Sequence, residues 1–330
     1  MKTIPLLEPL AAELEQVERK LLEPTHPDYP QLTTVLESLL LSGGKRLRPA
    51  LVLLAGSFYP TDREKLVSLA ASVEMLHTAT LVHDDLIDGA LVRRGRTTLN
   101  ARWNAGATVL TGDYLFARAA ALAAATENVR VVTIFAETLM TICSGELRQI
   151  FDRRELPRLD DEQAWQSALE RYDQRIYAKT ASLFSAATET AAVLGNAPEV
   201  HVTALREYGR LLGTGFQIMD DVLDFQGDEQ VLGKPVGSDL REGIVTLPVL
   251  YFLRDHPDDE RVASVVRDGG QDAVVREVVV AVRESGAVDR AVDRAREFIA
   301  QSQAALAVLP ESRARDLMYA LADYTISRDR

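Results

Sequence analysis

The chain has 330 residues, of which 47% are hydrophobic and 26% are charged, and its formal net charge is −12 with a pI near 5.0. These proportions are ordinary for a soluble globular protein with a sizeable core, so a disordered chain is not expected. The acidic balance argues against a nucleic-acid partner, because binding to a phosphate backbone needs a basic face.

The sequence pattern predicts helices almost throughout. Apolar residues recur at three- and four-residue spacing, whereas alternating or β-branched runs bounded by turn residues are scarce. Glycine and proline clusters predict interhelical loops at residues 24–30, 42–44, 89–95, 195–198, 227–237 and 269–270. We expect one all-α domain over residues 1–330, closed by amphipathic helices in the segment 273–330.

The composition favours a soluble cytoplasmic protein. The residues after Met1 form no long apolar region, so no signal peptide is expected. No uninterrupted apolar stretch reaches the roughly 20 residues that a membrane span needs. A single cysteine, Cys143, gives neither an internal disulfide nor a zinc ligand set and fits a reducing compartment. Cys143, Trp103 and Trp165 are interpreted as structural residues.

Three short basic clusters stand out, each at a glycine-containing turn. The first is Gly43-Gly44-Lys45-Arg46-Leu47-Arg48-Pro49, and the others lie at residues 93–96 and 233–235. Arginine's planar fork suits phosphate oxygens, lysine supplies a point charge, and glycine lets the backbone approach closely. Any one cluster taken alone would be read as a solvated loop.

The helix expected over residues 66–88 ends in the acidic motif Asp84-Asp85-Leu86-Ile87-Asp88. Asp84 and Asp88 form an i,i+4 pair whose like charges repel in an isolated helix. A hard cation would offset this repulsion, since Mg²⁺ prefers one or two protein carboxylates, waters and substrate phosphate oxygens. With a rotation of about 100° per residue, the face below this pair carries Val73, His77 and Thr80.

A second acidic motif, Asp220-Asp221-Val222-Leu223-Asp224, ends the helix expected over residues 205–225. A single motif of this kind is most simply a solvated helix end, but the presence of a second copy favours a function common to both. Gly209 and Gly213 share its face, where they fit close helix packing, a cavity wall or both. Two facing acidic pairs in a helical bundle provide a site where metal ions clamp one anionic group.

The basic clusters follow the acidic motifs in a regular way. Arg93 lies a short loop beyond Asp88, and Lys234 lies a similar distance beyond Asp224. This order suits two neighbouring anionic groups, one held by metals and the other held directly by basic side chains. The basic side chains expected to do so are Lys45, Arg48 and Arg94.

These motifs together resemble the trans-isoprenyl diphosphate synthases, also called polyprenyl synthetases, from about Gly43 to Pro248. The matching blocks are Gly-Gly-Lys-Arg-Leu-Arg-Pro (43–49), Glu-Met-Leu-His (74–77), Leu-Val-His-Asp-Asp-Leu-Ile-Asp (81–88), Arg-Arg-Gly (93–95), Gly-Asp-Tyr-Leu (112–115), Lys-Thr-Ala-Ser-Leu (179–183), Gly-Phe-Gln-Ile-Met-Asp-Asp-Val-Leu-Asp (215–224) and Gly-Lys-Pro-Val-Gly-Ser-Asp-Leu (233–240). Ile244 departs from the pattern, because many relatives carry lysine there. The resemblance implies the all-α isoprenoid synthase fold around a deep cavity, a homodimer, and about three Mg²⁺ ions per site.

The resemblance also implies residue roles. Catalytic roles fall to Lys179 and to the motif aspartates Asp84, Asp85, Asp88, Asp220, Asp221 and Asp224, with Asp84, Asp88 and Asp220 carrying the metals. Isopentenyl diphosphate would be bound by Lys45, Arg48, His77 and Arg94. The allylic diphosphate would be bound by Arg93, Lys179, Thr180, Gln217 and Lys234.

The implied reaction is ionisation of the allylic diphosphate, attack by the double bond of isopentenyl diphosphate, and loss of a proton. Apolar walls would exclude water that quenches the cation. The residues below the first motif would set product length: Ala79, Thr80, Leu76 and Val73, with Phe116 as a deeper floor. Because Ala79 and Thr80 are small, we expect a medium- or long-chain polyprenyl diphosphate.

Other interpretations stay open at this stage. The chain could make geranylgeranyl or farnesyl diphosphate, or be the catalytic subunit of a heteromeric synthase. A class I terpene cyclase is disfavoured, because a cyclase has no second diphosphate for Lys45, Arg48 and Arg94 to bind. A regulatory subunit is disfavoured too, since no motif aspartate is missing.

Overall fold

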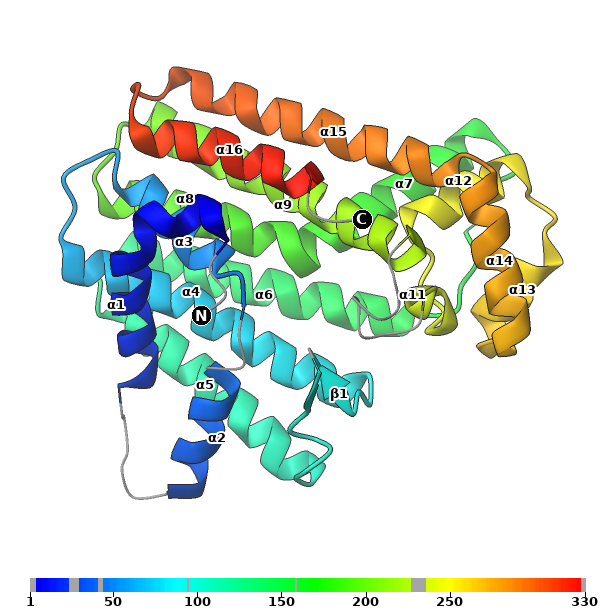
Figure 1. The fold of residues 1–330 in the computed structure, drawn as a ribbon, viewed down its shortest axis with the longest axis horizontal. Coiled ribbons are helices and arrows are strands. Elements are labelled where there is room, and N and C mark those ends of the chain that lie inside the picture. The colour runs from blue at the N-terminus through cyan, green and yellow to red at the C-terminus, as the bar shows by residue number, and fades with distance from the viewer. Residues whose placement is uncertain are drawn as a thin grey trace. The chain divides into compact units, whose positions relative to one another are not determined.

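The computed structural model describes residues 4–23, 30–40, 44–93, 95–157, 159–226 and 236–327. Apart from one two-stranded hairpin, these residues form helices and their connections (Figure 1), so the expected all-α class is confirmed. The chain divides into two compact units. Our expectation of a single domain over residues 1–330 stays a prediction.

The first unit comprises Met1–Thr138, Leu183–Arg206 and Leu306–Ala320. It contains the short helix η1 (Pro5–Leu10), α1 (Ala11–Leu22), α2 (Pro30–Leu40), α3 (Leu47–Gly56), α4 (Arg63–Ile87), α5 (Ala105–Ala124), the start of α6 (Val129–Phe151), most of α8 (Ser182–Leu194), the start of α9 (Glu199–Gln226), η3 (Leu306–Val308) and part of α16 (Arg313–Ser327). Helix α4 packs most extensively along α5 and also contacts α3 and α1 (Figure 1).

Helix α4 is the central helix of this unit. It begins after Asp62, whose side chain accepts hydrogen bonds from the backbone N–H groups of Glu64 and Lys65. In the described part of the chain it is the one helix long and apolar enough to cross a membrane, yet 67% of its apolar stretch is buried inside the protein. A core helix has this composition because neighbouring helices cover it on several sides.

The hairpin that follows α4 pairs β1 (Val92–Arg93) with β2 (Arg96–Thr97) in antiparallel register.

Close packing of α5 on α4 depends on Gly112, where a Cβ atom would collide with the His83 ring. This explains the glycine of the block Gly-Asp-Tyr-Leu by sterics alone.

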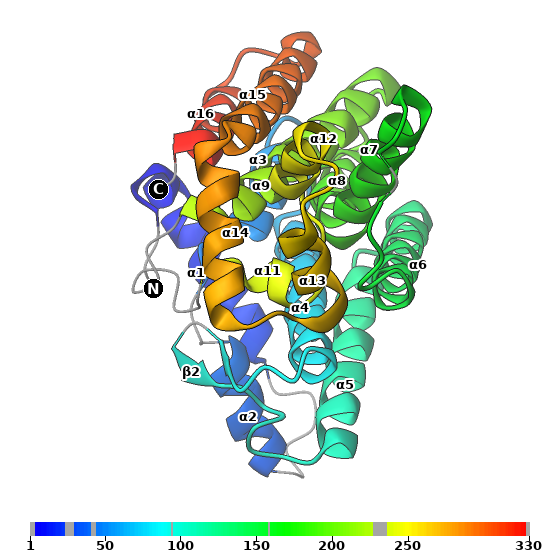
Figure 2. The same cartoon turned by 90° about the vertical axis from the view of Figure 1, so that its right-hand side faces the viewer.

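The second unit comprises Leu139–Ser182, Glu207–Ala305 and Leu321–Arg330. Besides parts of α6, α9 and α16, it contains α7 (Glu162–Ile176), the π-helical turn η2 (Tyr177–Ala181), α11 (Ser238–Arg241), α12 (Leu247–Asp255), α13 (Glu260–Asp268), α14 (Asp272–Glu284) and α15 (Ala287–Ala305). Figure 2 shows α13 beside α14, and α12 also packs on α15.

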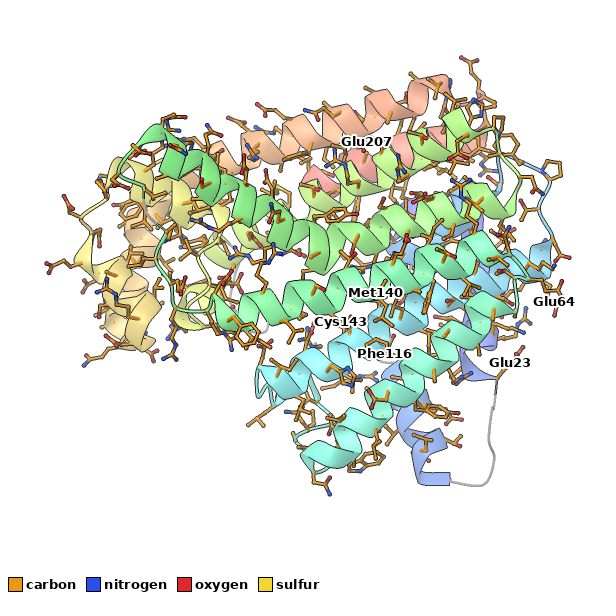
Figure 3. The ribbon with its side chains drawn as sticks, turned by 180° about the vertical axis from the view of Figure 1, so that it is seen from behind. Glu23, Glu64, Phe116, Met140, Cys143 and Glu207 are labelled. Atoms are coloured by element: carbon orange, nitrogen blue, oxygen red, sulfur yellow. The ribbon has the colours of Figure 1, made fainter. Side chains whose placement is uncertain are left out.

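An apolar core of α7, α9, α12, α13, α14 and α15 side chains fills this unit. Trp165 is buried in it beside Tyr251, with the Arg254 guanidinium 4.5 Å from its ring centre, as a structural residue should be. Gly215 lets α9 approach α15 closely, because an added Cβ would press on Ile299. Cys143 is exposed on α6 (Figure 3).

Candidate active site

The first acidic motif forms the carboxyl-terminal end of α4. Asp84 is half-buried, Asp85 is buried, and Asp88 is exposed as the residue that caps the helix. The backbone N–H of Asp88 donates to the carbonyl of Asp84, which holds the motif in its final helical turn. The three aspartates therefore differ in solvent access although they lie within five residues.

Asp85 has a defined partner in the hairpin. The Arg93 Nε atom donates to the Asp85 carboxylate, and the two side chains form an ion pair. Burial raises the pKa of Asp85 above its ordinary value, while the Arg93 guanidinium acts in the opposite direction. Arg93, which we expected at the allylic diphosphate, thus also ties the hairpin to the first motif.

Arg46, which our residue assignment left out, is a buried anchor of the basic loop. Its φ of 52° is in the left-handed region, unusual for a residue other than glycine. Its guanidinium donates to the Glu74 carboxylate at 2.6 Å and to the carbonyl of Leu40 at 2.6 Å, and it also contacts Glu18. The sequence signal for this contact was that a cation, Arg46, lies in the block 43–49 and a carboxylate, Glu74, lies in the block 74–77.

The expected isopentenyl diphosphate residues belong to the first unit. Lys45 is exposed directly before Arg46, and the Arg48 guanidinium lies 4.6 Å from the centre of the Phe184 ring. His77 is half-buried on α4, one turn after Glu74, the partner of Arg46. The buried ion pair therefore ties the loop to α4 one turn before His77. Arg94 lies outside the described residues.

The residues expected to set product length lie mainly in the core of the first unit. Val73, Leu76 and Ala79 are buried on α4. Thr80 is half-buried, and its hydroxyl donates to the carbonyl of His77. Phe116 on α5 (Figure 3) packs edge-on against His83 at 5.0 Å between ring centres. Their influence on product length stays a prediction.

In the second unit, Lys179 and Thr180 lie in the π-helical turn η2. Such turns have no simple sequence pattern and often occur at functional sites. Helix α6 approaches this turn at Gly145, where a Cβ atom would collide with Ala178. The next residue, Glu146, forms an ion pair with Lys179 at 3.1 Å. The ammonium group is therefore held next to the turn instead of extending freely into water.

A chain of hydrogen bonds connects η2 to the second acidic motif on α9. The Thr180 hydroxyl donates to Gln217 Oε1 at 2.6 Å, and Gln217 Nε2 donates to Asp221 Oδ1 at 2.9 Å. The Tyr172 hydroxyl donates to Asp221 Oδ2 at 2.8 Å. Burial raises the pKa of Asp221 to about 6, although the hydrogen bonds from Gln217 and Tyr172 stabilise the charged carboxylate and act in the opposite direction. Our residue assignment contained Thr180, Gln217 and Asp221, but not Tyr172.

Asp224 is also buried and held by protein donors. Its Oδ1 atom accepts from the Ser238 hydroxyl at 2.7 Å, and its Oδ2 atom accepts from the backbone N–H of Asp239 at 3.2 Å. These contacts tie the second motif to α11. Asp220 is half-buried. Lys234 lies outside the described residues, and Ile244 is half-buried in the connection after α11.

The donor chemistry of the two motifs fits Mg²⁺. Among the described residues, no three His, Cys, Asp or Glu side chains are gathered into a ready-made metal site. A magnesium site built from one or two carboxylates, waters and substrate phosphate needs no such cluster. Asp88 is exposed, and Asp84 and Asp220 are half-buried, which suits such a ligand set.

In this all-α protein Arg93 pairs with the first acidic motif, and Lys179 adjoins Thr180, from which hydrogen bonds lead to the second, so the site suits a diphosphate held by metal ions and basic side chains. The polyprenyl synthetase family matches residues 29–282. The chain belongs to this family, as the motifs indicated.

The relatives cover nearly the whole chain. It is 40% identical to the "Heptaprenyl diphosphate synthase component 2" of Geobacillus stearothermophilus, over 97% of each chain. It is 34% identical to the octaprenyl diphosphate synthase of Haemophilus influenzae, over 96% of this chain and 94% of that protein.

Solved structures agree with the fold. A polyprenyl synthase from Caulobacter crescentus, complexed with calcium and isoprenyl diphosphate, has a TM-score of 0.88 and 36% identity and covers 98% of this chain and 97% of its own. A decaprenyl diphosphate synthase from Rhodobacter capsulatus also has a TM-score of 0.88 and 36% identity, with 98% of each chain covered. The isoprenoid synthase fold is therefore confirmed.

Proposed function

We propose that this protein is a Mg²⁺-dependent trans-prenyltransferase that extends an allylic diphosphate with isopentenyl diphosphate to a medium- or long-chain polyprenyl diphosphate. The observation that carries the proposal is the pair of acidic motifs, each ending a helix and each accompanied by cationic side chains of its own unit. The names of the relatives, which include heptaprenyl, octaprenyl and decaprenyl diphosphate synthases, support the same reaction and product class.

The residues divide between two diphosphates in this proposal. Asp84, Asp88 and Asp220 hold about three Mg²⁺ ions, which neutralise the leaving diphosphate when bound. Arg93, Lys179, Thr180, Gln217 and Lys234 bind the allylic diphosphate directly. Lys45, Arg48, His77 and Arg94 bind isopentenyl diphosphate and orient its double bond. The calcium and isoprenyl diphosphate in the Caulobacter crescentus relative support a site of this kind.

Catalysis in this scheme is positioning and electrostatic stabilisation, without a protein nucleophile. Lys179 stabilises negative charge on the departing diphosphate, and its ion pair with Glu146 holds the ammonium group at the π-helical turn beforehand. Apolar walls exclude water that would capture the carbocation. Small residues at Ala79 and Thr80 leave room for a growing chain.

We further propose that the protein works as a homodimer in the cytoplasm. In the second unit, α6 exposes apolar residues at helical spacing: Met140 is 61% exposed, Leu147 55% and Phe151 76%. Figure 3 shows Met140 and Cys143 on this helix. Such a stripe is costly to leave in water, and a second copy would cover it. Leu147→Glu should give a monomer in light scattering, whereas Arg148→Glu, at an exposed neighbour, should not.

The decisive experiment incubates the purified protein with isopentenyl diphosphate, Mg²⁺ and geranyl, farnesyl or geranylgeranyl diphosphate, and sizes the products after dephosphorylation. Polyprenyl chains longer than geranylgeranyl support the proposal. Products that stop at farnesyl or geranylgeranyl would assign the chain to the short-chain class, and cyclic hydrocarbons would make it a cyclase.

One alternative is favoured by a specific comparison, because the Geobacillus stearothermophilus relative is named as one component of its synthase. A purified chain that binds allylic diphosphate but turns over only after a cell extract is added would be a catalytic subunit that needs a partner. Turnover by the chain alone, at a rate that extract does not change, rules this alternative out.

A further inference from the structure

Tyr172 is a buried tyrosine with a fixed position in the second unit. Its ring belongs to the apolar core formed by α7, α9 and α12, and 2% of the residue is exposed. The Arg175 guanidinium lies 5.4 Å from the ring centre and is itself held by the carbonyl of Val245. A side chain packed in this way provides an immobile hydroxyl group.

The hydroxyl group is the only polar part of the Tyr172 side chain, and it donates to a carboxylate that is also buried. Asp221 is 3% exposed, and its two oxygens accept from Tyr172 and from Gln217. An ionised carboxylate only accepts hydrogen bonds. Asp221 therefore requires donors on both sides, and Tyr172 supplies the one that is anchored in the core.

The orientation of the Gln217 amide follows from this arrangement. If the amide were reversed, its carbonyl oxygen would face an Asp221 oxygen at about the same short distance, and two acceptors repel. The carboxylate thus selects the orientation in which Nε2 faces Asp221 and Oε1 faces the Thr180 hydroxyl. In the proposed function the second N–H of this amide faces the ligand, since a primary amide carries two.

We infer that Tyr172 is a positioning residue of the allylic diphosphate site, which acts through Asp221 to fix the amide of Gln217. The inference rests on the proposed function, in which Gln217 and Thr180 bind the allylic diphosphate. Tyr172 does not touch substrate in this scheme. In the same scheme Asp221 supports Gln217 and does not bind a metal ion, although Asp221 is the central residue of an aspartate motif.

The test is Tyr172→Phe, which removes one oxygen atom and keeps the ring. The matched control is Tyr208→Phe, at a tyrosine that is also fully buried in the second unit, on α9 but outside the hydrogen-bond chain. Steady-state kinetics give kcat and the KM of each substrate, and thermal unfolding gives Tm. We expect Tyr172→Phe to raise the KM of the allylic diphosphate about tenfold, on the scale of one hydrogen bond to a charged group.

The KM of isopentenyl diphosphate should change less than twofold, and the fall in Tm should be similar in the two variants. Equal allylic KM values for Tyr172→Phe and Tyr208→Phe would overturn the inference, because the hydroxyl would then be only structural. So would a proportional rise in both substrate KM values. If Tyr172→Phe is too unstable to assay, Asp221→Asn removes the negatively charged acceptor from the same hydroxyl and is subject to the same criteria.

A double-mutant cycle shows whether Tyr172 acts through Gln217. Gln217→Ala alone should raise the allylic KM, and adding Tyr172→Phe should raise it little further, because coupled residues are not additive. Full additivity contradicts the inference. Failure of the proposed function would look different. In that case the wild-type protein itself would not condense an allylic diphosphate with isopentenyl diphosphate in the presence of Mg²⁺.

Discussion

The two acidic motifs have aspartates at the same three positions, yet the surroundings of those aspartates differ. In the first, Asp88 is exposed at the end of α4 and Asp85 pairs with a partly exposed arginine, Arg93. In the second, Asp224 is buried and accepts hydrogen bonds from Ser238 and Asp239, and Asp221 is enclosed as well. The first position is half-buried and the second is buried in both motifs, so the difference in solvent access lies at the third position.

This difference bears on how metal ligands are assigned from a motif. A carboxylate whose two oxygens already accept from protein donors has fewer lone-pair sites left for a cation than a carboxylate that faces water. Asp221 and Asp224 are in that position. This agrees with our proposal, in which the metal ligands are Asp84 and Asp88 of the first motif and Asp220 of the second.

The largest effect is expected at the first motif. Asp84→Asn keeps the shape of the side chain and removes its charge, so it should lower kcat by roughly a thousandfold through lost metal-assisted stabilisation of the leaving group. The measurement is radiolabelled isopentenyl diphosphate incorporation at saturating Mg²⁺. Asp289→Asn, at an exposed site on α15, is the control and should be unaffected. Near-normal turnover of Asp84→Asn contradicts the metal assignment.

A smaller but more diagnostic effect separates two aspartates one turn apart on α9. Asp220→Asn should raise the Mg²⁺ concentration that gives half-maximal activity, because it removes a ligand. Asp224→Asn should lower kcat by about 10- to 100-fold through disturbed support of the motif, with an unchanged Mg²⁺ requirement. Activity measured across a Mg²⁺ titration checks both. An equal shift for the two variants would mean that Asp224 also binds metal.

A substitution on the face of α4 below the first motif should change the length of the product without a large loss of rate. Thr80→Phe places an aromatic ring one turn before Asp84 and should shorten the polyprenyl product. Thr78→Phe makes the same substitution on a different face of α4 and should leave the product length as it is. Thin-layer chromatography of the dephosphorylated products compares the two. An unchanged profile for Thr80→Phe refutes our cavity assignment.

The helices and both motifs were predictable because they depend on local patterns. Apolar periodicity marks α4 and α9, and acidic residues at their ends mark the motifs, although the structure begins the helices earlier, at Arg63 and Glu199. The helical segment from residue 273 onward was predicted for the same reason, and it forms α14, α15 and α16. The fold class follows from such local signals, which accumulate along the chain.

The supports of the site were not predictable in this way. Tyr172 meets Asp221 across 49 residues of chain, and Arg46 meets Glu74 across 28, so no local period connects either pair. The π-helical turn at Lys179 adds one residue to a helical turn and leaves no mark in the hydrophobic pattern. Local sequence patterns do not reveal the long-range hydrogen bonds that give corresponding aspartates of the two motifs different surroundings.

The smallest effect is expected at Asp85, the central residue of the first motif. The same substitution to asparagine at Asp85 and at Asp221 compares the central residues of the two motifs. At Asp85, the described donor is Arg93, and an asparagine oxygen can still accept from it. At Asp221, two donors face the carboxylate, and an asparagine oxygen can satisfy one of them, so a buried donor is left without an acceptor. Asp85→Asn should therefore change the allylic KM only slightly, whereas Asp221→Asn should raise it about tenfold. Burial already disfavours the charged form of Asp85, so we expect its replacement to leave Tm nearly unchanged in thermal unfolding. If Asp85→Asn instead proves as damaging as Asp221→Asn, the ion pair with Arg93 contributes more to the site than its partial exposure suggests.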